Sequence, residues 1–292
     1  MPWVNYHSHC NFCDGSDEPE TYVKEALKKA FPAYGFSSHA PLPFSADWSI
    51  PGNRFDAYLS EINRIKQKYR NRIQVYMGLE VDFIPGLTGI EKLLSKGINM
   101  DYLIGSVHFI DAFAYGDPWS FDGSTETFQK GFKQIFHNDG QKLVRRYYEL
   151  VRQMIEEDAP EIIGHLDKIK MHNPICNYLN ENDTWYRKEV EKTIKSIKKK
   201  DVIVEVNTRG YYKNDRPALL YPGEWILELL KQENVRIMIN ADTHHPDEVD
   251  AGFVHAAEIL KKIGFKHILA LLDGEWKPYM FDKKGIIMGN VY

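Results

Sequence analysis

The 292-residue sequence has few cysteines and no long hydrophobic runs. Three cysteines, an odd number, do not make a disulfide framework, and no apolar run approaches the roughly 18 residues of a membrane-spanning helix. No N-terminal apolar run resembles a signal peptide. We therefore expect a cytoplasmic protein without a membrane role.

Basic residues are not in surplus either. Lys+Arg number 37 and Asp+Glu 41, a formal net charge of -4, so no general basic field exists to hold nucleic acid. We find no Gly-rich phosphate loop of either standard kind, which disfavours a nucleotide-binding fold. Histidine, by contrast, occurs 11 times.

Short β-type runs alternate with amphipathic helical stretches along the whole chain. The helices are clearest from Val23 to Ala30, with Ser16 or Asp17 as N-cap and Pro19 in the first turn, and from Val249 to Ile263. Other helical patterns lie near 56–70, 125–157, 185–199 and 223–232. The seven β-type runs are 3–6, 34–37, 73–79, 102–107, 162–164, 202–206 and 236–239.

This alternation predicts a parallel sheet with right-handed crossovers, either an open doubly wound sheet or a closed barrel. No linker, low-complexity block or internal repeat divides the chain. We therefore predict a single domain over residues 1–292.

Metal-competent side chains occur where six of the seven predicted strands end. In a βα barrel all carboxyl ends open on one face, so these residues would converge there. Imidazoles and carboxylates suit zinc, iron and manganese, and the i, i+2 spacing of His7 and His9 points both rings to one side. The candidate metal ligands are His7, His9, Asp14, His39, Glu80, His108, His165, Asp242 and His244.

Cys10 and Cys13 form a C-x-x-C pair that could be a redox dithiol or half of a zinc site. Only Cys176 remains besides, which excludes a four-thiolate zinc site. Packing is the default interpretation of this pair.

Several short motifs in register resemble the polymerase and histidinol phosphatase (PHP) superfamily. They are His7-x-His9-x4-Asp14, Ser38-His39-Ala40-Pro41-Leu42-Pro43, Gly78-Leu79-Glu80-Val81-Asp82, Ser106-Val107-His108-Phe109, Gly164-His165 and Asp242-x-His244. The first three look most like the histidinol-phosphate phosphatase branch.

The resemblance implies a distorted seven-stranded (β/α)7 barrel, similar to a TIM barrel, with two to three divalent ions at its carboxyl end. It assigns His7, His9, Glu80 and Asp242 to one ion, and bridging Glu80 with His108 and His165 to a second. Asp14, His39 and His244 would hold a third. Zinc, iron and manganese are all used in the family.

The expected activity is hydrolysis of a small phosphate monoester, L-histidinol phosphate in histidine biosynthesis, with Asp242 or His244 assisting the leaving group. The family's usual arginine after the sixth strand is Tyr212 here, so Arg209, Lys213 or Arg216 could bind the phosphate. Further candidates for substrate contact are Ser106, Trp119 and Asp122.

The last two lie in the stretch from Phe109 to Ser124, which we expect to be a long irregular loop. Its aromatic and acidic residues suit an amine and an imidazole, although Trp119 and Phe121 could equally pin the loop to the barrel. Three rival functions stay open: a phosphoesterase for another small ester such as a nucleotide, a metal-dependent amidohydrolase, and a non-catalytic metal-stabilised module.

Overall fold

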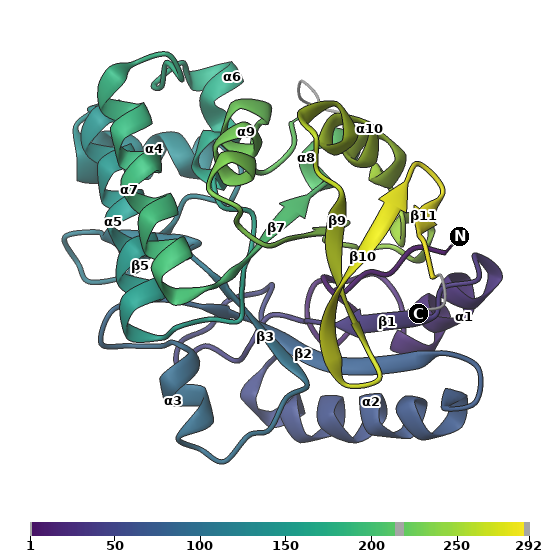
Figure 1. Cartoon of the computed structure of the whole chain (residues 1–292). Coiled ribbons are helices and arrows are strands. Elements are labelled where there is room, and N and C mark those ends of the chain that lie inside the picture. The colour runs from purple at the N-terminus through teal and green to yellow at the C-terminus, as the bar shows by residue number, and fades with distance from the viewer. Residues whose placement is uncertain (1, 214–218, 289–292) are drawn as a thin grey trace.

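A computed structural model describes residues 2–213 and 219–288; Arg216, one of the phosphate-binding candidates, lies outside them. Six parallel strands form one curled sheet in the order β1-β2-β3-β6-β7-β8 (Figure 1). Their bounds are β1 Ala33–Phe36, β2 Gln74–Asp82, β3 Tyr102–Ser106, β6 Ile162–Ile163, β7 Ile203–Asn207 and β8 Ile237–Asn240. Sequential strands are neighbours, as the alternating pattern predicts.

The N-terminal segment closes this sheet into the expected distorted barrel. Asn5 bridges Tyr34 of β1 in parallel, and Ser8 bridges Thr243, just after β8. The predicted first strand is therefore two isolated bridges rather than a regular strand, because its polar residues bond to side chains as well as to backbone. One example is the backbone N–H of Tyr6, which donates to Oδ1 of Asn240 at 2.9 Å.

Helices cover the outside of the sheet (Figure 1). The main ones are α1 Pro19–Lys28, α2 Phe55–Tyr69, α4 Thr125–Phe136, α5 Gly140–Glu157, α7 Thr184–Lys200, α9 Glu224–Gln232 and α10 Phe253–Ile263. Shorter turns are α3 Ile90–Leu94, α6 Asn173–Cys176, α8 Arg209–Tyr212, η1 Gly52–Arg54, η2 Lys168–His172 and η3 Pro246–Glu248. In the described residues, no helix is long and apolar enough to cross a membrane.

Several predicted helix boundaries differ from the structure; the helix predicted from Val249, for example, begins at Phe253. The N-cap of α1 is Glu18, without a side-chain cap, because the helix begins directly at Pro19; Ser16 and Asp17 precede it. The stretch 125–157 is two helices. His137 and Asn138 have φ of 54° and 61°, left-handed values that end α4, and the Asp139 side chain then accepts from the N–H of Lys142 to cap α5.

The C-terminal segment covers the end of the barrel where the strands begin. β9 His267–Leu272 and β10 Glu275–Asp282 form an antiparallel hairpin, followed by β11 Gly285–Ile286. The hydroxyl of Tyr6 donates to the carbonyl of Leu271 at 2.7 Å, and the ring of Trp276 packs edge-on against Tyr6 with centroids 5.3 Å apart. The opposite end, where the strands finish, stays open.

Candidate active site

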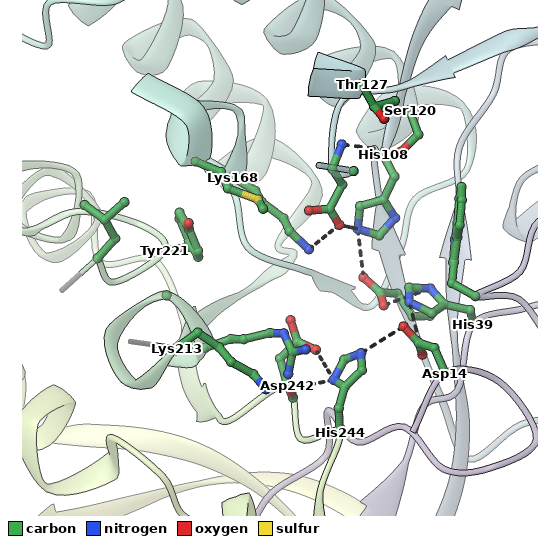
Figure 2. Close-up of a pocket in the computed structure, with 18 residues that line it drawn as sticks. Asp14, His39, His108, Ser120, Thr127, Lys168, Lys213, Tyr221, Asp242 and His244 are labelled. Carbon is green, nitrogen blue, oxygen red and sulfur yellow. Dashed lines mark hydrogen bonds and ion pairs between the residues drawn. The ribbon is translucent and has the colours of Figure 1, made fainter. Parts of the chain in front are cut away.

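All nine candidate metal ligands lie together at the carboxyl end of the barrel. His7 and His9 come from the closing segment, and His39 follows β1. Glu80 is in β2, while His108 and His165 follow β3 and β6. Figure 2 shows His39, Asp14, His108, Asp242 and His244 grouped together at one cavity. Residues up to 235 positions apart in the sequence, such as His7 and Asp242, are thereby brought within contact distance, as the strand pattern predicts.

Glu80 occupies the centre of this cluster. Its Oε2 lies 3.1 Å from Nε2 of His7, 3.5 Å from Nε2 of His9 and 3.2 Å from Nδ1 of His39. Its Oε1 lies 2.9 Å from Nε2 of His165 and 3.6 Å from Nε2 of His108. The two oxygens thus face two different sets of imidazoles, which is the placement that a bridging carboxylate requires.

The remaining ligands form a second side of the cluster. Nε2 of His244 lies 3.2 Å from Oδ2 of Asp14 (Figure 2). Oδ1 of Asp242 lies 3.3 Å from Nε2 of His9. Donor atoms of His9, Asp14, His39 and His244 all fall within 4.8 Å of one another, as do those of His7, His9 and Asp242. His9 therefore belongs to both groups, which the sequence did not indicate.

This donor set fits divalent ions. Nε2 of His108 and Nε2 of His165 face each other at 3.1 Å. Nε2 of His7, Nε2 of His9 and Nδ1 of His39 are buried, and they make no hydrogen bond to any described residue. Buried nitrogens without partners are costly unless they ligate an ion.

The electrostatics of the two main carboxylates agree with this role. Burial would raise the pKa of Glu80, but the imidazoles of His7, His39 and His108 lower it well below its ordinary value. Burial would also raise the pKa of Asp242, but His7 and His9 lower it well below its ordinary value. Both groups are therefore negatively charged at neutral pH, as cation ligands must be.

Two of the candidate ligands have a left-handed backbone conformation. Asp242 has φ of 55° and His165 has φ of 24°, both in the left-handed region that non-glycine residues rarely adopt. Such conformations persist where the surrounding structure imposes them, and they cluster at functional sites.

Two carboxylates that sequence reasoning missed hold the ligands from behind. Oε1 of Glu205 accepts from Nδ1 of His7 at 2.6 Å, and its Oε2 accepts from the backbone N–H of His165 at 2.9 Å. Oδ1 of Asp82 likewise accepts from Nδ1 of His108 at 2.8 Å. Such partners fix the ring tautomer so that Nε2 faces the ion. A carboxylate inside an otherwise apolar strand, as Glu205 is in β7, was the signal available in the sequence.

Ser106 also supports a ligand rather than lining the cavity. It is 1% exposed, and its hydroxyl donates to Oε1 of Glu80 at 2.6 Å. Ser106 is not among the residues that line the cavity, so its contact with substrate or phosphate stays a prediction without support from this geometry.

The segment after His108 is more regular than expected, and it turns Trp119 inward. Residues Phe109–Ala112 (β4) and Pro118–Ser120 (β5) pair as an antiparallel hairpin. Trp119 is 1% exposed and its Nε1–H donates to the carbonyl of Thr127. Trp119 is thus a core residue and not a substrate contact; the interpretation that it pins the loop is the correct one.

Asp122, from the same segment, does line the cavity. The cavity has a volume of about 570 Å³, and its aromatic walls are Trp48 and Tyr221. Lys168, which sequence reasoning missed, lines it as well, and its Nζ lies 2.7 Å from Oδ2 of Asp122 (Figure 2). Burial opposes the charge on Lys168, but Asp122, Asp242 and Glu80 raise its pKa above the ordinary value.

Arg209 and Lys213 line this cavity as well. Nη1 of Arg209 donates to the backbone carbonyl of Asp242 at 2.9 Å, beside the cluster. Tyr212, at the position where the related phosphatases have arginine, points instead to the backbone: its hydroxyl donates to the carbonyl of Ala241 at 2.9 Å. Cationic groups from two segments, after β6 and after β7, therefore line the cavity beside the cluster.

The C-x-x-C pair has no cavity of its own. Cys10 is fully buried with its Sγ 3.3 Å from Oγ of Ser38, and burial raises its pKa to about 11. Sγ of Cys13 lies 3.6 Å from Nδ1 of His9. All three cysteines are free thiols, which agrees with a packing role.

Residues 5–209 match the PHP domain family. The chain belongs to this family. A relative from Schizosaccharomyces pombe, named a probable histidinol-phosphatase, is 26% identical over 100% of this chain and 94% of its own length. The family match ends before Asp242 and His244, so their place in the cluster is established by the geometry alone.

Two solved structures share the fold. A protein from Listeria monocytogenes aligns with 86% of this chain and 99% of its own, with a TM-score of 0.75 and 23% identity. The histidinol phosphate phosphatase of Lactococcus lactis, solved with zinc, L-histidinol and phosphate, aligns with 98% of both chains, with a TM-score of 0.66 and 20% identity.

Proposed function

We propose that this protein is a metal-dependent histidinol-phosphatase that hydrolyses L-histidinol phosphate to L-histidinol and phosphate. The observation that carries the proposal is the convergence of nine metal-competent side chains beside a cavity with cationic walls. The name of the S. pombe relative and the ligands of the L. lactis structure support the choice of substrate. The whole chain, residues 1–292, would act as one domain in the cytoplasm, where its thiols stay reduced.

We assign two to three divalent ions, zinc, iron or manganese, to the cluster. His7, His9, Glu80 and Asp242 would hold one, Glu80 with His108 and His165 a second, and Asp14, His39 and His244 a third. When bound, such ions lower the pKa of water and act as Lewis acids toward phosphate oxygens.

The protein's own residues bind and orient the ester. Arg209, Lys213 and Lys168, all of which line the cavity, would neutralise the phosphate oxygens and hold the phosphate in line for transfer. Asp242 and His244 lie side by side, with Oδ1 3.5 Å from Nδ1. Because Asp242 is ionised, it would orient His244, and His244 would pass a proton to the departing alcohol oxygen.

The other end of the substrate would meet Asp122 and the aromatic walls. Burial opposes the charge on Asp122, but Lys168 and His108 lower its pKa, so it presents a negative charge to an ammonium group. Trp48, held by stacking on Phe109 with centroids 5.6 Å apart, takes the place that the sequence suggested for Trp119. An aromatic face and a carboxylate suit an imidazole and an amine.

The deciding experiment is a phosphate-release screen on purified protein supplied with manganese or zinc. Histidinol phosphate should be preferred over mononucleotides and sugar phosphates, and a strong preference for a nucleotide would contradict the substrate assignment. Trp48→Leu should raise the KM for histidinol phosphate about 10-fold by loss of the aromatic contact. Trp119→Leu, the matched control, should lower stability and leave KM unchanged.

A further inference from the structure

Glu248 lies just outside the residues that line the cavity and contacts two of the segments that do line it. Its side chain is 16% exposed, at the end of η3. Its Oε2 accepts from the backbone N–H of His244 at 2.9 Å and of His245 at 3.1 Å. Its Oε1 lies 3.0 Å from Nζ of Lys213. One carboxylate thus touches both the segment after β8, which carries metal ligands, and the segment after β7, which carries cations.

The same carboxylate faces the other groups of the β7 segment. Nη1 of Arg209 lies 3.8 Å from Oε2 of Glu248, and the hydroxyl of Tyr212 lies 3.4 Å from the same oxygen. Arg209 and Lys213 are therefore held at one wall of the cavity by a shared negative charge. Without it, two cations beside each other would repel, and Lys213, whose side chain is 51% exposed, would turn toward solvent.

Two roles of Glu248 can be separated by chemistry. Accepting hydrogen bonds from the N–H groups of His244 and His245 is a capping role, and it needs only an oxygen acceptor. Holding Arg209 and Lys213 needs the negative charge. An amide in the same position keeps the first role and loses the second, because its oxygen still accepts while its NH2 group faces a cation.

We propose that Glu248 is a positioning residue for phosphate binding, whose charge keeps Arg209 and Lys213 at the cavity wall in register with His244. This inference rests on the proposed function, because it takes the phosphate group to be what the two cations bind. It adds a determinant of phosphate affinity that does not itself line the cavity.

The test is Glu248→Gln, assayed with the metal-loaded full chain. The KM for histidinol phosphate and the inhibition constant of inorganic phosphate should rise together by about 10-fold, the effect of losing a charge-assisted contact. Bound metal and kcat should stay within about twofold of wild type. Glu233→Gln, the control, removes an exposed Glu–Lys pair with Lys198 at 2.6 Å and should change none of these quantities.

Three results would overturn the proposal. They are an unchanged phosphate inhibition constant, a loss of bound metal with KM unaltered, and a melting temperature so low that the folded fraction accounts for the whole effect. A Lys213→Met background provides a second measurement: Glu248→Gln should there raise the inhibition constant by less than in the wild-type chain, because part of what it holds is already absent.

Failure of the proposed function gives a different outcome. A wild-type protein that hydrolyses another phosphate ester instead of histidinol phosphate would contradict the substrate assignment, yet the inorganic phosphate measurement would still decide the role of Glu248. A metal-loaded wild-type protein that binds no inorganic phosphate by calorimetry would overturn both.

Discussion

The two ends of the barrel are built from the same strands but differ in whether their buried polar groups are hydrogen-bonded. At the end covered by β9 and β10, the hydroxyl of Tyr6 donates to the carbonyl of Leu271 and accepts from its N–H at 3.0 Å. The hydroxyl of Tyr102 donates to the carbonyl of Tyr6 in the same way. At the open end, ring nitrogens of His7, His9 and His39 are buried without hydrogen bonds.

This difference separates stability from function. Satisfied polar groups under a hairpin stabilise the fold, whereas converging groups without partners destabilise it unless an ion binds them. In barrels of this kind the chemistry occurs at the carboxyl ends of the strands. Substitutions at the two ends should therefore have different consequences, activity at one and stability at the other.

The largest effect should follow from Glu80→Gln at the open end. Loss of the central carboxylate removes a negative charge from both sets of imidazoles, so the ions should be lost. Activity should fall by more than about 100-fold, beyond what losing an outer partner of a ligand costs. Phosphate release and elemental analysis of the purified protein measure this, and an active, metal-replete variant would contradict the assignment.

A smaller loss is expected for Glu205→Gln, which leaves every ligand in place. Without the carboxylate that accepts from Nδ1 of His7, metal affinity or activity should fall by about 10- to 100-fold. Glu161→Gln is the matched control: its carboxylate accepts from Nε1 of Trp276 at 3.0 Å, at the covered end. Equal losses of metal affinity or activity in the two variants would contradict the distinction between the two ends of the barrel.

Tyr6→Phe should change stability and not activity. It leaves the N–H and carbonyl of Leu271 without their partner, which costs about 1–3 kcal/mol of the free energy of unfolding. The value of kcat/KM should stay within about twofold of wild type. Denaturant unfolding of the metal-free protein gives the first quantity, and a large loss of activity at full folding would show that the two ends are coupled.

The smallest effect concerns Cys10, beside the open end. With a pKa of about 11, only about one thiol in a thousand is ionised at pH 8, since the thiolate fraction falls tenfold per unit. Iodoacetamide should therefore label the half-buried Cys176 long before Cys10 in the folded protein. Mass spectrometry of the digested protein reads this out, and prompt labelling of Cys10 would restore the redox interpretation.

The convergence of the candidate ligands was predictable because most of them lie in or just after a strand, and parallel strands place their carboxyl ends together. Glu205 was not, because its partner His7 lies 198 positions away and a lone carboxylate in a strand does not name its partner. Lys168 was not predicted either, because its sequence position does not name its partner Asp122. Trp119 was misplaced because the sequence does not show which face of a short hairpin turns toward the core.

The central claim is that a divalent metal cluster drives phosphate release from histidinol phosphate. The most direct measurement strips the purified protein with a chelator and then follows phosphate release while zinc or manganese is added back. We predict no activity after stripping, and a recovery that rises with bound metal up to two or three ions per chain. Full activity in the stripped protein, with no metal bound, would contradict the account.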